Sequence, residues 1–307
     1  MSSISRKQFS GLPWQHTRRF LGAPPASSRD TALLCSLLHF VIAYMDNVPN
    51  SDGTMLWIKS SFIGNEASII SLLRRVELYP QQTVHDSIEV TQLHIHIVKV
   101  LLRCIMMLEK WDDYDSYKLE SLLKILLACL DKLDIRNFHI LGYLNELMRC
   151  IRYAVNSRYC KLSEDTLNQC LRLVARTLTG CASGGGCKGQ ACRLDAVLAL
   201  LALLRQIHDE AIPVQRWSES FNIDLVRVVV RSMAGARAEL RAASLHVVAA
   251  LAHYAQLMPH LMQAIQVSSL SEFAATIFSQ RGEANTVRAA AAALLASIAS
   301  RVSPRSD

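Results

Sequence analysis

The chain has 307 residues, of which 51% are hydrophobic and 19% are charged, a composition that is typical of a globular protein and excludes a disordered one. Its formal net charge is +7, but residues 1–29 hold five basic residues and no acidic residue, so the rest of the chain carries only about +2. A body with so little excess charge lacks the basic footprint of a nucleic-acid-binding protein, and we expect no nucleic acid as a partner.

Residues 1–29 are rich in Gly, Pro and Ser as well as in arginine, and we expect them to form a disordered basic tail. The same arginine-rich, acid-free composition is typical of a mitochondrial transit peptide, which leaves the mitochondrion as an alternative to the cytoplasm or nucleus. The nine cysteines are an odd number, and several lie in apolar runs, so we expect a reducing, intracellular compartment. No run of about 18 apolar residues predicts a membrane span.

From residue 30 onward, apolar residues recur at spacings of three and four, which predicts helices. Strand signals are nearly absent, so the expected fold class is all-α. In an N-terminal region over residues 30–160, the predicted helices cover residues 30–46, 66–78, 88–108, 117–133 and 135–155. An acidic loop is expected at residues 111–115. The last two helices are separated only by Asp134, which predicts an antiparallel hairpin.

Residues 161–300 repeat one pattern, in which a serine-capped helix, a glycine and a short turn precede a helix that begins with arginine. The capped helices are predicted over residues 163–178, 218–233 and 268–278, and each ends near a glycine suited to a left-handed C-terminal cap: Gly180, Gly235 and Gly282. The first unit contains seven extra residues, which we interpret as a loop insertion over residues 181–192. A second disordered tail is expected at residues 301–307.

Two of the arginine-led helices match without a gap, 47 residues apart. Their sequences are Leu240-Arg-Ala-Ala-Ser-Leu-His-Val-Val-Ala-Ala-Leu-Ala and Val287-Arg-Ala-Ala-Ala-Ala-Ala-Leu-Leu-Ala-Ser-Ile-Ala. Both resemble the final helix of armadillo repeats. The resemblance implies an armadillo/HEAT-like α-solenoid of stacked helical hairpins, whose final helices line a concave groove that binds extended peptides or other proteins. The groove would be lined by residues 193–204, 240–254 and 287–298. Residues 30–160 fit the repeat pattern less well. Such a poor fit is expected of irregular repeats, of a capping unit or of the end of a larger solenoid.

The candidates for binding a partner lie on these arginine-led helices. They are Arg193, Arg241 and Arg288 at equivalent positions, together with His246. A row of guanidiniums would suit an acidic peptide. The alternative is that each arginine pairs with a local acid such as Asp195, Glu239 or Glu283. If the row binds a partner, reversing Arg241 and Arg288 to glutamate should leave helicity intact and weaken binding.

Cys181, Cys187 and Cys192 are the nearest approach to a metal site, with His208 as a further candidate ligand. Their spacing departs from that of paired zinc ligands, so we interpret them as incidental thiols in a flexible loop, with a redox-sensitive disulfide as the alternative. The sequence contains no glycine-flanked nucleophile or phosphate loop, so we expect no enzyme activity, cofactor or metal. The predicted function is a non-enzymatic protein-interaction scaffold or adaptor. The alternative is a mitochondrially targeted helical-repeat protein that binds RNA or an organellar complex, and the oligomeric state is left open.

Overall fold

The structure is a computed structural model that describes residues 28–47, 84–110, 116–135, 140–181, 187–217, 221, 223–233, 235, 237–265 and 269–302. Several sequence predictions fall outside these residues: the helix over 66–78, the acidic loop at 111–115, and most of the tails at 1–29 and 301–307. The exceptions in the tails are residues 28–29 and 301–302, which belong to helices.

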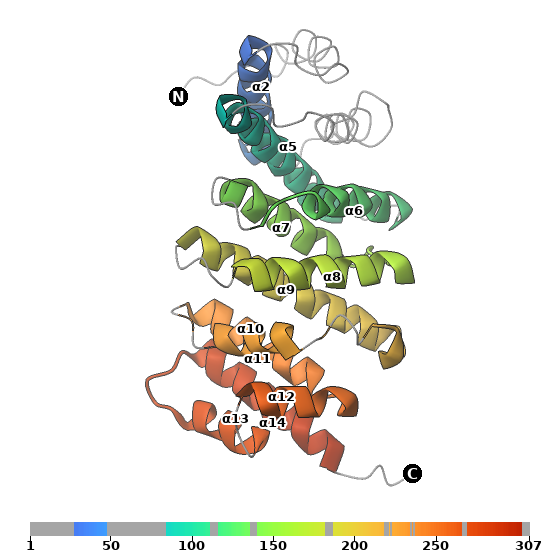
Figure 1. The fold of residues 1–307 in the computed structure, drawn as a ribbon, viewed down its shortest axis with the longest axis vertical. Helices are drawn as coiled ribbons and strands as arrows, with labels where there is room; N and C mark the ends of the chain where they lie inside the picture. The colour runs from blue at the N-terminus through green and yellow to red at the C-terminus, as the bar shows by residue number, and fades with distance from the viewer. Residues whose placement is uncertain are drawn as a thin grey trace. The chain divides into compact units, whose positions relative to one another are not determined.

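The described residues form helices and no strand, which confirms the all-α prediction (Figure 1). The α-helices are α2 (Ser28–Asn47), α5 (Val84–Lys110), α6 (Ser116–Asp131), α7 (Leu141–Asn156), α8 (Glu164–Cys181), α9 (Cys187–Asp209), α10 (Ile223–Ser232), α11 (Ala238–Leu251), α12 (Met258–Ile265), α13 (Leu270–Ser279) and α14 (Asn285–Val302). Two short 3₁₀ segments, η4 (Val214–Arg216) and η6 (Ala255–Leu257), lie between them. None of the described helices combines the length and the apolar character that crossing a bilayer requires.

The chain divides into two compact units. The first comprises residues 1–132 and 157–161, and within it α2 packs against α5. α2 buries residues spaced by three and four, which form one stripe along a helix: Leu34, Leu38, Val41 and Met45. At the edge of this contact the Arg103 guanidinium makes a bidentate pair with Asp46, with both N···O distances at 3.0 Å. This pair links the two helices at the surface.

The second unit comprises residues 133–156 and 162–307. In it α7 packs on α9, α9 on α11, and α11 on α14, so these four helices contact one another in chain order. The helices between them in sequence make a second set of contacts: α8 packs on α9 and α10, α10 on α11 and α12, and α13 on α14 (Figure 1). α9, α11 and α14 are therefore each supported by the helix that precedes them in the chain.

The internal sequence match corresponds to equal positions in helices. Leu240 and Arg241 are the third and fourth residues of α11, and Val287 and Arg288 are the third and fourth residues of α14. The branched residue is buried in both helices. The first of the three sequence repeats differs, because Arg193 is the seventh residue of α9. Residues 187–192, which the sequence assigns to an inserted loop, form the first turns of that helix, because Lys, Gln and Ala permit helix on either side of Gly189.

The prediction of left-handed glycine caps is wrong, since no described glycine has a positive φ. Gly180 lies inside α8, which continues to Cys181. Its role is close approach: a Cβ at this position would lie 2.6 Å from the Ile135 Cγ2 atom. A left-handed cap occurs instead at Ala211, where φ is 52°.

Two other boundaries differ from the predictions. The cap of α13 is Ser269, whose hydroxyl accepts the Glu272 N–H, so the helix starts later than predicted. α6 ends at Asp131 and α7 begins at Leu141, so a connection of one residue is wrong. Leu133 and Ile135 continue the apolar spacing through a turn, which is why the pattern merged the turn with the helices.

Candidate functional site

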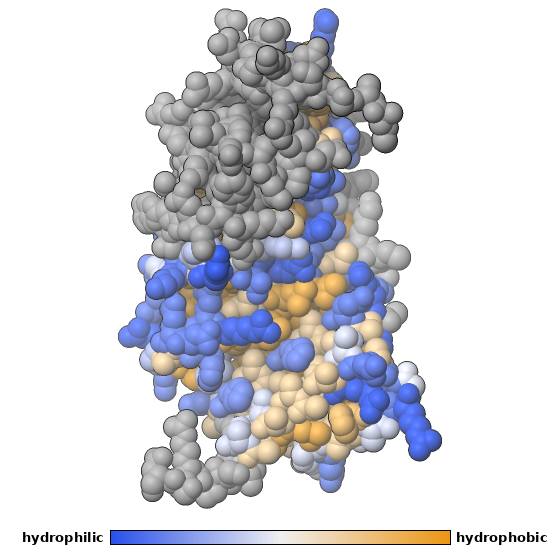
Figure 2. Space-filling model, turned by 180° about the vertical axis from the view of Figure 1, so that it is seen from behind, coloured by the Kyte–Doolittle hydropathy of each residue, from blue (hydrophilic) through white to orange (hydrophobic). Residues whose placement is uncertain are grey.

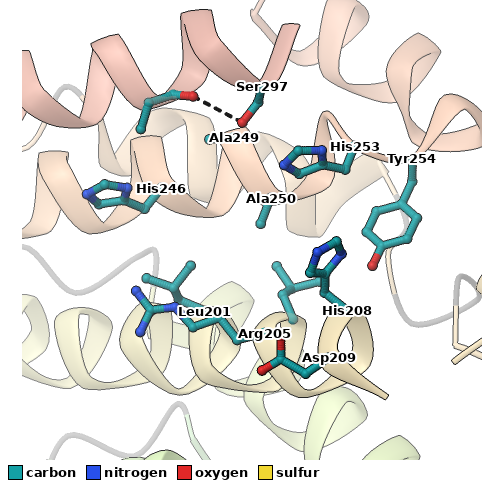
Figure 3. Close-up of a pocket in the computed structure, with 12 residues that line it drawn as sticks. Leu201, Arg205, His208, Asp209, His246, Ala249, Ala250, His253, Tyr254 and Ser297 are labelled. Carbon is teal, nitrogen blue, oxygen red and sulfur yellow. Dashed lines mark hydrogen bonds between the residues drawn. The ribbon is translucent and has the colours of Figure 1, made fainter. Parts of the chain in front are cut away.

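A hollow of about 250 Å³ lies on the second unit, between α9, α11 and α14 (Figure 3). Four groups of residues line it: Leu201, Leu204, Arg205, His208 and Asp209 from α9; His246, Ala249 and Ala250 from α11; His253 and Tyr254 just after α11; and Ala293 and Ser297 from α14. The five residues from α9 have the same spacing as the five from α11 and the positions just after it. In each set the later residues follow the first one by three, four, seven and eight positions, which is the spacing of one helix face.

The hollow has an apolar floor and a polar rim. Leu201, Leu204 and Ala249 are buried, whereas Arg205, His208 and His253 are exposed at the edge. Alanines on α11 and α14 leave space that larger side chains would fill. Figure 2 views the molecule from behind and shows hydrophobic surface between hydrophilic side chains over the region that holds α9 to α14.

Ring contacts position the rim at the C-terminal ends of α9 and α11. His208 and His253 point toward one another and stack, with their ring centroids 5.8 Å apart and an interplanar angle of 28° (Figure 3). The Tyr254 ring packs edge-on against buried Trp217 at 4.9 Å. The Trp217 indole N–H in turn donates to the Ile212 carbonyl at 3.4 Å. These contacts give the aromatic end of the hollow a fixed wall.

The titratable groups of the hollow favour their neutral forms where they are buried. Burial lowers the pKa of His246 from its ordinary value of 6.5, and the Arg205 guanidinium lowers it further. Burial also raises the pKa of Tyr254, which keeps the phenol protonated. The hollow therefore offers a neutral His246 imidazole and a neutral Tyr254 hydroxyl beside the Arg205 guanidinium, and Asp209 lies at one end.

Of the residues predicted from sequence, His246 lines the hollow and the three arginines do not. Arg241 donates to the Gly235 carbonyl at 2.8 Å and pairs with the Glu283 carboxylate at 2.5 Å. Arg288 donates to the Phe278 carbonyl at 3.0 Å and lies over the Phe278 ring. Arg193 is half-buried beside Cys192. The pairing of Arg241 with Glu283 is the local arrangement that the sequence offered as an alternative.

The sequence places His253 and Tyr254 within the predicted groove range 240–254 and His208 among possible metal ligands, but it singles out none of these, nor Arg205, as a residue that binds a partner. A signal for them existed, because the spacing from Leu201 to His208 repeats from His246 to His253, 45 residues later. The sequence match is strongest at the beginnings of the helices, whereas these polar residues lie on the same faces farther along, where the match is weaker.

Among the residues that the structure describes, no three His, Cys, Asp or Glu side chains are placed to hold a metal ion, and the side chain of Cys187 lies outside those residues. Two thiols of the three-cysteine cluster do meet: the sulfur atoms of Cys181 and Cys192 are 3.7 Å apart, and both residues are buried.

Comparison with known proteins gives no assignment, because no protein-family model matches this chain and no curated protein sequence matches it significantly.

Proposed function

We propose that this protein is a non-enzymatic interaction module that holds an extended segment of a protein partner against α9, α11 and α14. The observation that carries the proposal is the hollow itself, which spans three consecutive packed helices and combines an apolar floor with a polar rim. Pockets of this composition bind side chains: the floor takes an apolar part, and a few polar groups fix its orientation.

The architecture that best fits this role is an armadillo/HEAT-like α-solenoid. Two features support it: the equal helix positions of Arg241 and Arg288, and the repeated contact of each arginine-led helix with the next. In such an array one helix face recurs in every repeat, so an extended chain can contact several repeats in succession.

The partner segment that we propose is acidic. Arg205 is exposed at the rim, and three imidazoles lie near it, so a carboxylate in the hollow would gain a charged hydrogen bond and further donors. The Asp209 side chain would repel an acidic segment, but it lies at only one end of the hollow. The row of repeat arginines is a weaker candidate, because Arg241 and Arg288 already make hydrogen bonds within the chain.

The chemistry of the lining residues favours binding over catalysis. The Ser297 hydroxyl donates to the Ala293 carbonyl at 3.0 Å, which uses its proton in the helix backbone (Figure 3). Tyr254 has a raised pKa and stays neutral. The lining residues therefore include no hydroxyl that a neighbouring base activates.

A displayed library of random peptides, selected on the purified chain, tests this proposal. We expect enrichment of peptides in which acidic and apolar residues alternate or adjoin. Arg205→Gln should weaken their binding about tenfold, as loss of one charged hydrogen bond predicts. Arg227→Gln is the matched control, because Arg227 is exposed on α10 and makes only a 3.4 Å pair with Asp224.

Enrichment of basic peptides, or equal weakening by the two substitutions, would contradict an acidic segment in this hollow. Reversal of Arg241 to glutamate is a poorer test, since it would place two carboxylates together at Glu283 and disturb folding as well as binding.

A further inference from the structure

Cys181 and Cys192 lie at a helix junction, where their thiols face each other. Cys181 is the last residue of α8 and Cys192 is the sixth residue of α9, and these two helices pack together. The sulfur atoms are 3.7 Å apart. A disulfide bond is about 2.05 Å long, so bond formation requires the sulfurs to approach by roughly 1.7 Å.

We propose that Cys181 and Cys192 form a reversible oxidative modification site, at which hydrogen peroxide converts two neighbouring thiols into a disulfide between α8 and α9. This site is independent of the proposed binding of an acidic peptide. It lies at the beginning of α9, whereas the hollow is lined from Leu201 onward. Nothing in the peptide-binding proposal is needed for it.

The surroundings of the two cysteines indicate which thiol attacks the peroxide first and which one then closes the disulfide. Hydrogen bonding from Cys192 lowers the pKa of Cys181, and the Arg193 guanidinium lowers it further, although burial acts in the opposite direction. The hydrogen bond with Cys181 and deep burial raise the pKa of Cys192. Cys181 is also the less deeply buried of the two. It is therefore the thiol that ionises first and attacks the oxidant, since the thiolate is the reactive form.

The reaction has two balanced steps. In the first, the Cys181 thiolate attacks one oxygen of hydrogen peroxide, the S–O bond forms, the O–O bond breaks, and the departing hydroxide takes a proton to become water. In the second, the Cys192 sulfur attacks the Cys181 sulfenic acid, the S–S bond forms, the S–O bond breaks, and a second water leaves with the remaining thiol proton. Overall the two sulfurs lose two electrons, and the peroxide is reduced to two water molecules.

Cys104 is a thiol of the same chain that we expect not to react with hydrogen peroxide. It is buried in α5, and burial raises its pKa far above the ordinary value. A protonated thiol in an apolar core is inert toward peroxide. Cys104 therefore serves as an internal reference in the same sample.

The experiment treats the purified full chain with hydrogen peroxide, blocks the remaining thiols by alkylation, digests with trypsin and identifies linked peptides by mass. Trypsin cleavage places Cys181 and Cys187 together in residues 177–188 and Cys192 in residues 189–193. A Cys187→Ser variant therefore makes the assignment unambiguous. We expect the linked pair in wild type and in Cys187→Ser, its loss in Cys181→Ser and in Cys192→Ser, its reversal by dithiothreitol, and no oxidation of Cys104.

Two outcomes would overturn the proposal. One is a linkage that survives Cys181→Ser and disappears in Cys187→Ser, which would assign the reaction to the other thiol. The other is complete alkylation of Cys181 and Cys192 in peroxide-treated Cys187→Ser protein after denaturation in the alkylating agent. Because the expected positive result comes from Cys187→Ser, the test does not depend on the folding of the variants that remove the pair.

Discussion

Arg241 and Arg288 occupy the same position in successive helices but differ in their surroundings. Arg241 joins the turn before its own helix to the turn before α14, since it contacts both the Gly235 carbonyl and Glu283. The side chains of this pair are only 20% and 15% exposed. Arg288 contacts the Phe278 carbonyl and ring at the surface. Sequence equivalence therefore does not imply equal energetic weight.

We expect Arg241→Ala to lower the free energy of unfolding by about 1.5–3 kcal/mol, because it removes charged hydrogen bonds and leaves Glu283 without its cation. Arg288→Ala, the repeat-equivalent control, should cost about 0.5–1 kcal/mol. Urea denaturation of both variants measures this difference. Equal losses would contradict the special role of Arg241.

The Arg241 prediction carries a pH dependence. The hydrogen bond from Arg241 lowers the pKa of Glu283 below its ordinary value of 4.5. A lowered carboxyl pKa means that the stabilisation is fully present above pH 4.5 and is lost as the pH falls through the folded-state pKa. The difference between wild type and Arg241→Ala should therefore shrink in acid.

His246 lines the hollow, and its surroundings there shift the pKa of its imidazole. Burial and Arg205 lower its pKa, so the folded chain resists protonation of this imidazole. The unfolded chain gains the proton as the pH falls below 6.5, so this group reduces the free energy of unfolding below that pH and has no effect above it. The size of this pH effect depends on the burial of His246 and on its proximity to Arg205.

We expect Arg205→Gln to raise the pKa of His246 only part of the way to its ordinary value, because burial is the larger cause and remains. An NMR titration of the histidine ring protons measures this pKa. Arg227→Gln should leave it unchanged. A His246 pKa that does not respond to either substitution would contradict the proximity of the two groups.

At the scale of elements, Gly180 determines how closely α8 approaches the segment before α7. Alanine in a helix is normally more stable than glycine by about 0.5–1 kcal/mol. At Gly180, however, the added Cβ would lie 2.6 Å from the Ile135 side chain. We expect Gly180→Ala to cost about 1–3 kcal/mol in the free energy of unfolding, as overpacking does.

Two controls accompany this prediction, and thermal and urea unfolding measure all the variants. Gly282 has open space where a Cβ would stand, so Gly282→Ala should change stability by less than about 0.5 kcal/mol. In an Ile135→Ala background the cost of Gly180→Ala should fall, because the clashing methyl is gone. A stabilising Gly180→Ala would show that α8 and Ile135 are free to move apart.

The sequence predicted the helices of the described residues well because helix formation depends on local spacing. It failed at the ends of helices. Three glycines indicated left-handed caps, yet it is Ala211, two residues after the end of α9 at Asp209, that caps a helix in this way. The pattern is that of a Schellman motif: the Ala211 N–H donates to the His208 carbonyl at 3.1 Å, and the Ile212 N–H donates to the Ile207 carbonyl at 3.0 Å. Pro213 then prevents continuation. A glycine is permitted at such a cap but is not required, and at Gly180 its reason is packing.

The candidate site was predicted only in part for the same reason. The helices that line it, and His246, follow from the repeat. Arg205 and His208 become neighbours of His246 and His253 only when α9 packs on α11, and that approach depends on small residues such as Ala249 and Ala250. The contact of Cys181 with Cys192 likewise depends on the helical conformation of residues 187–192, which the glycine content of the segment concealed.

At the scale of the whole molecule, the chain divides into two compact units. The second unit has repeated contacts between successive helices, and its buried residues are mostly Leu, Ala and Val. Because each helix of such an array rests mainly on its nearest neighbours, stability is distributed along the stack rather than concentrated at one centre.

We therefore expect residues 133–307 alone to fold into a helical, cooperatively unfolding protein. The core of this unit is drawn from its own helices, from α7 through α14, and the segment is long enough to bury a core of ordinary domain size. Circular dichroism during thermal unfolding measures helicity and cooperativity. Gly180→Ala provides the control, since it should shift the transition of the shorter chain as it does that of the full chain. A gradual melt with strong binding of a hydrophobic dye would instead show that the second unit needs the first in order to pack.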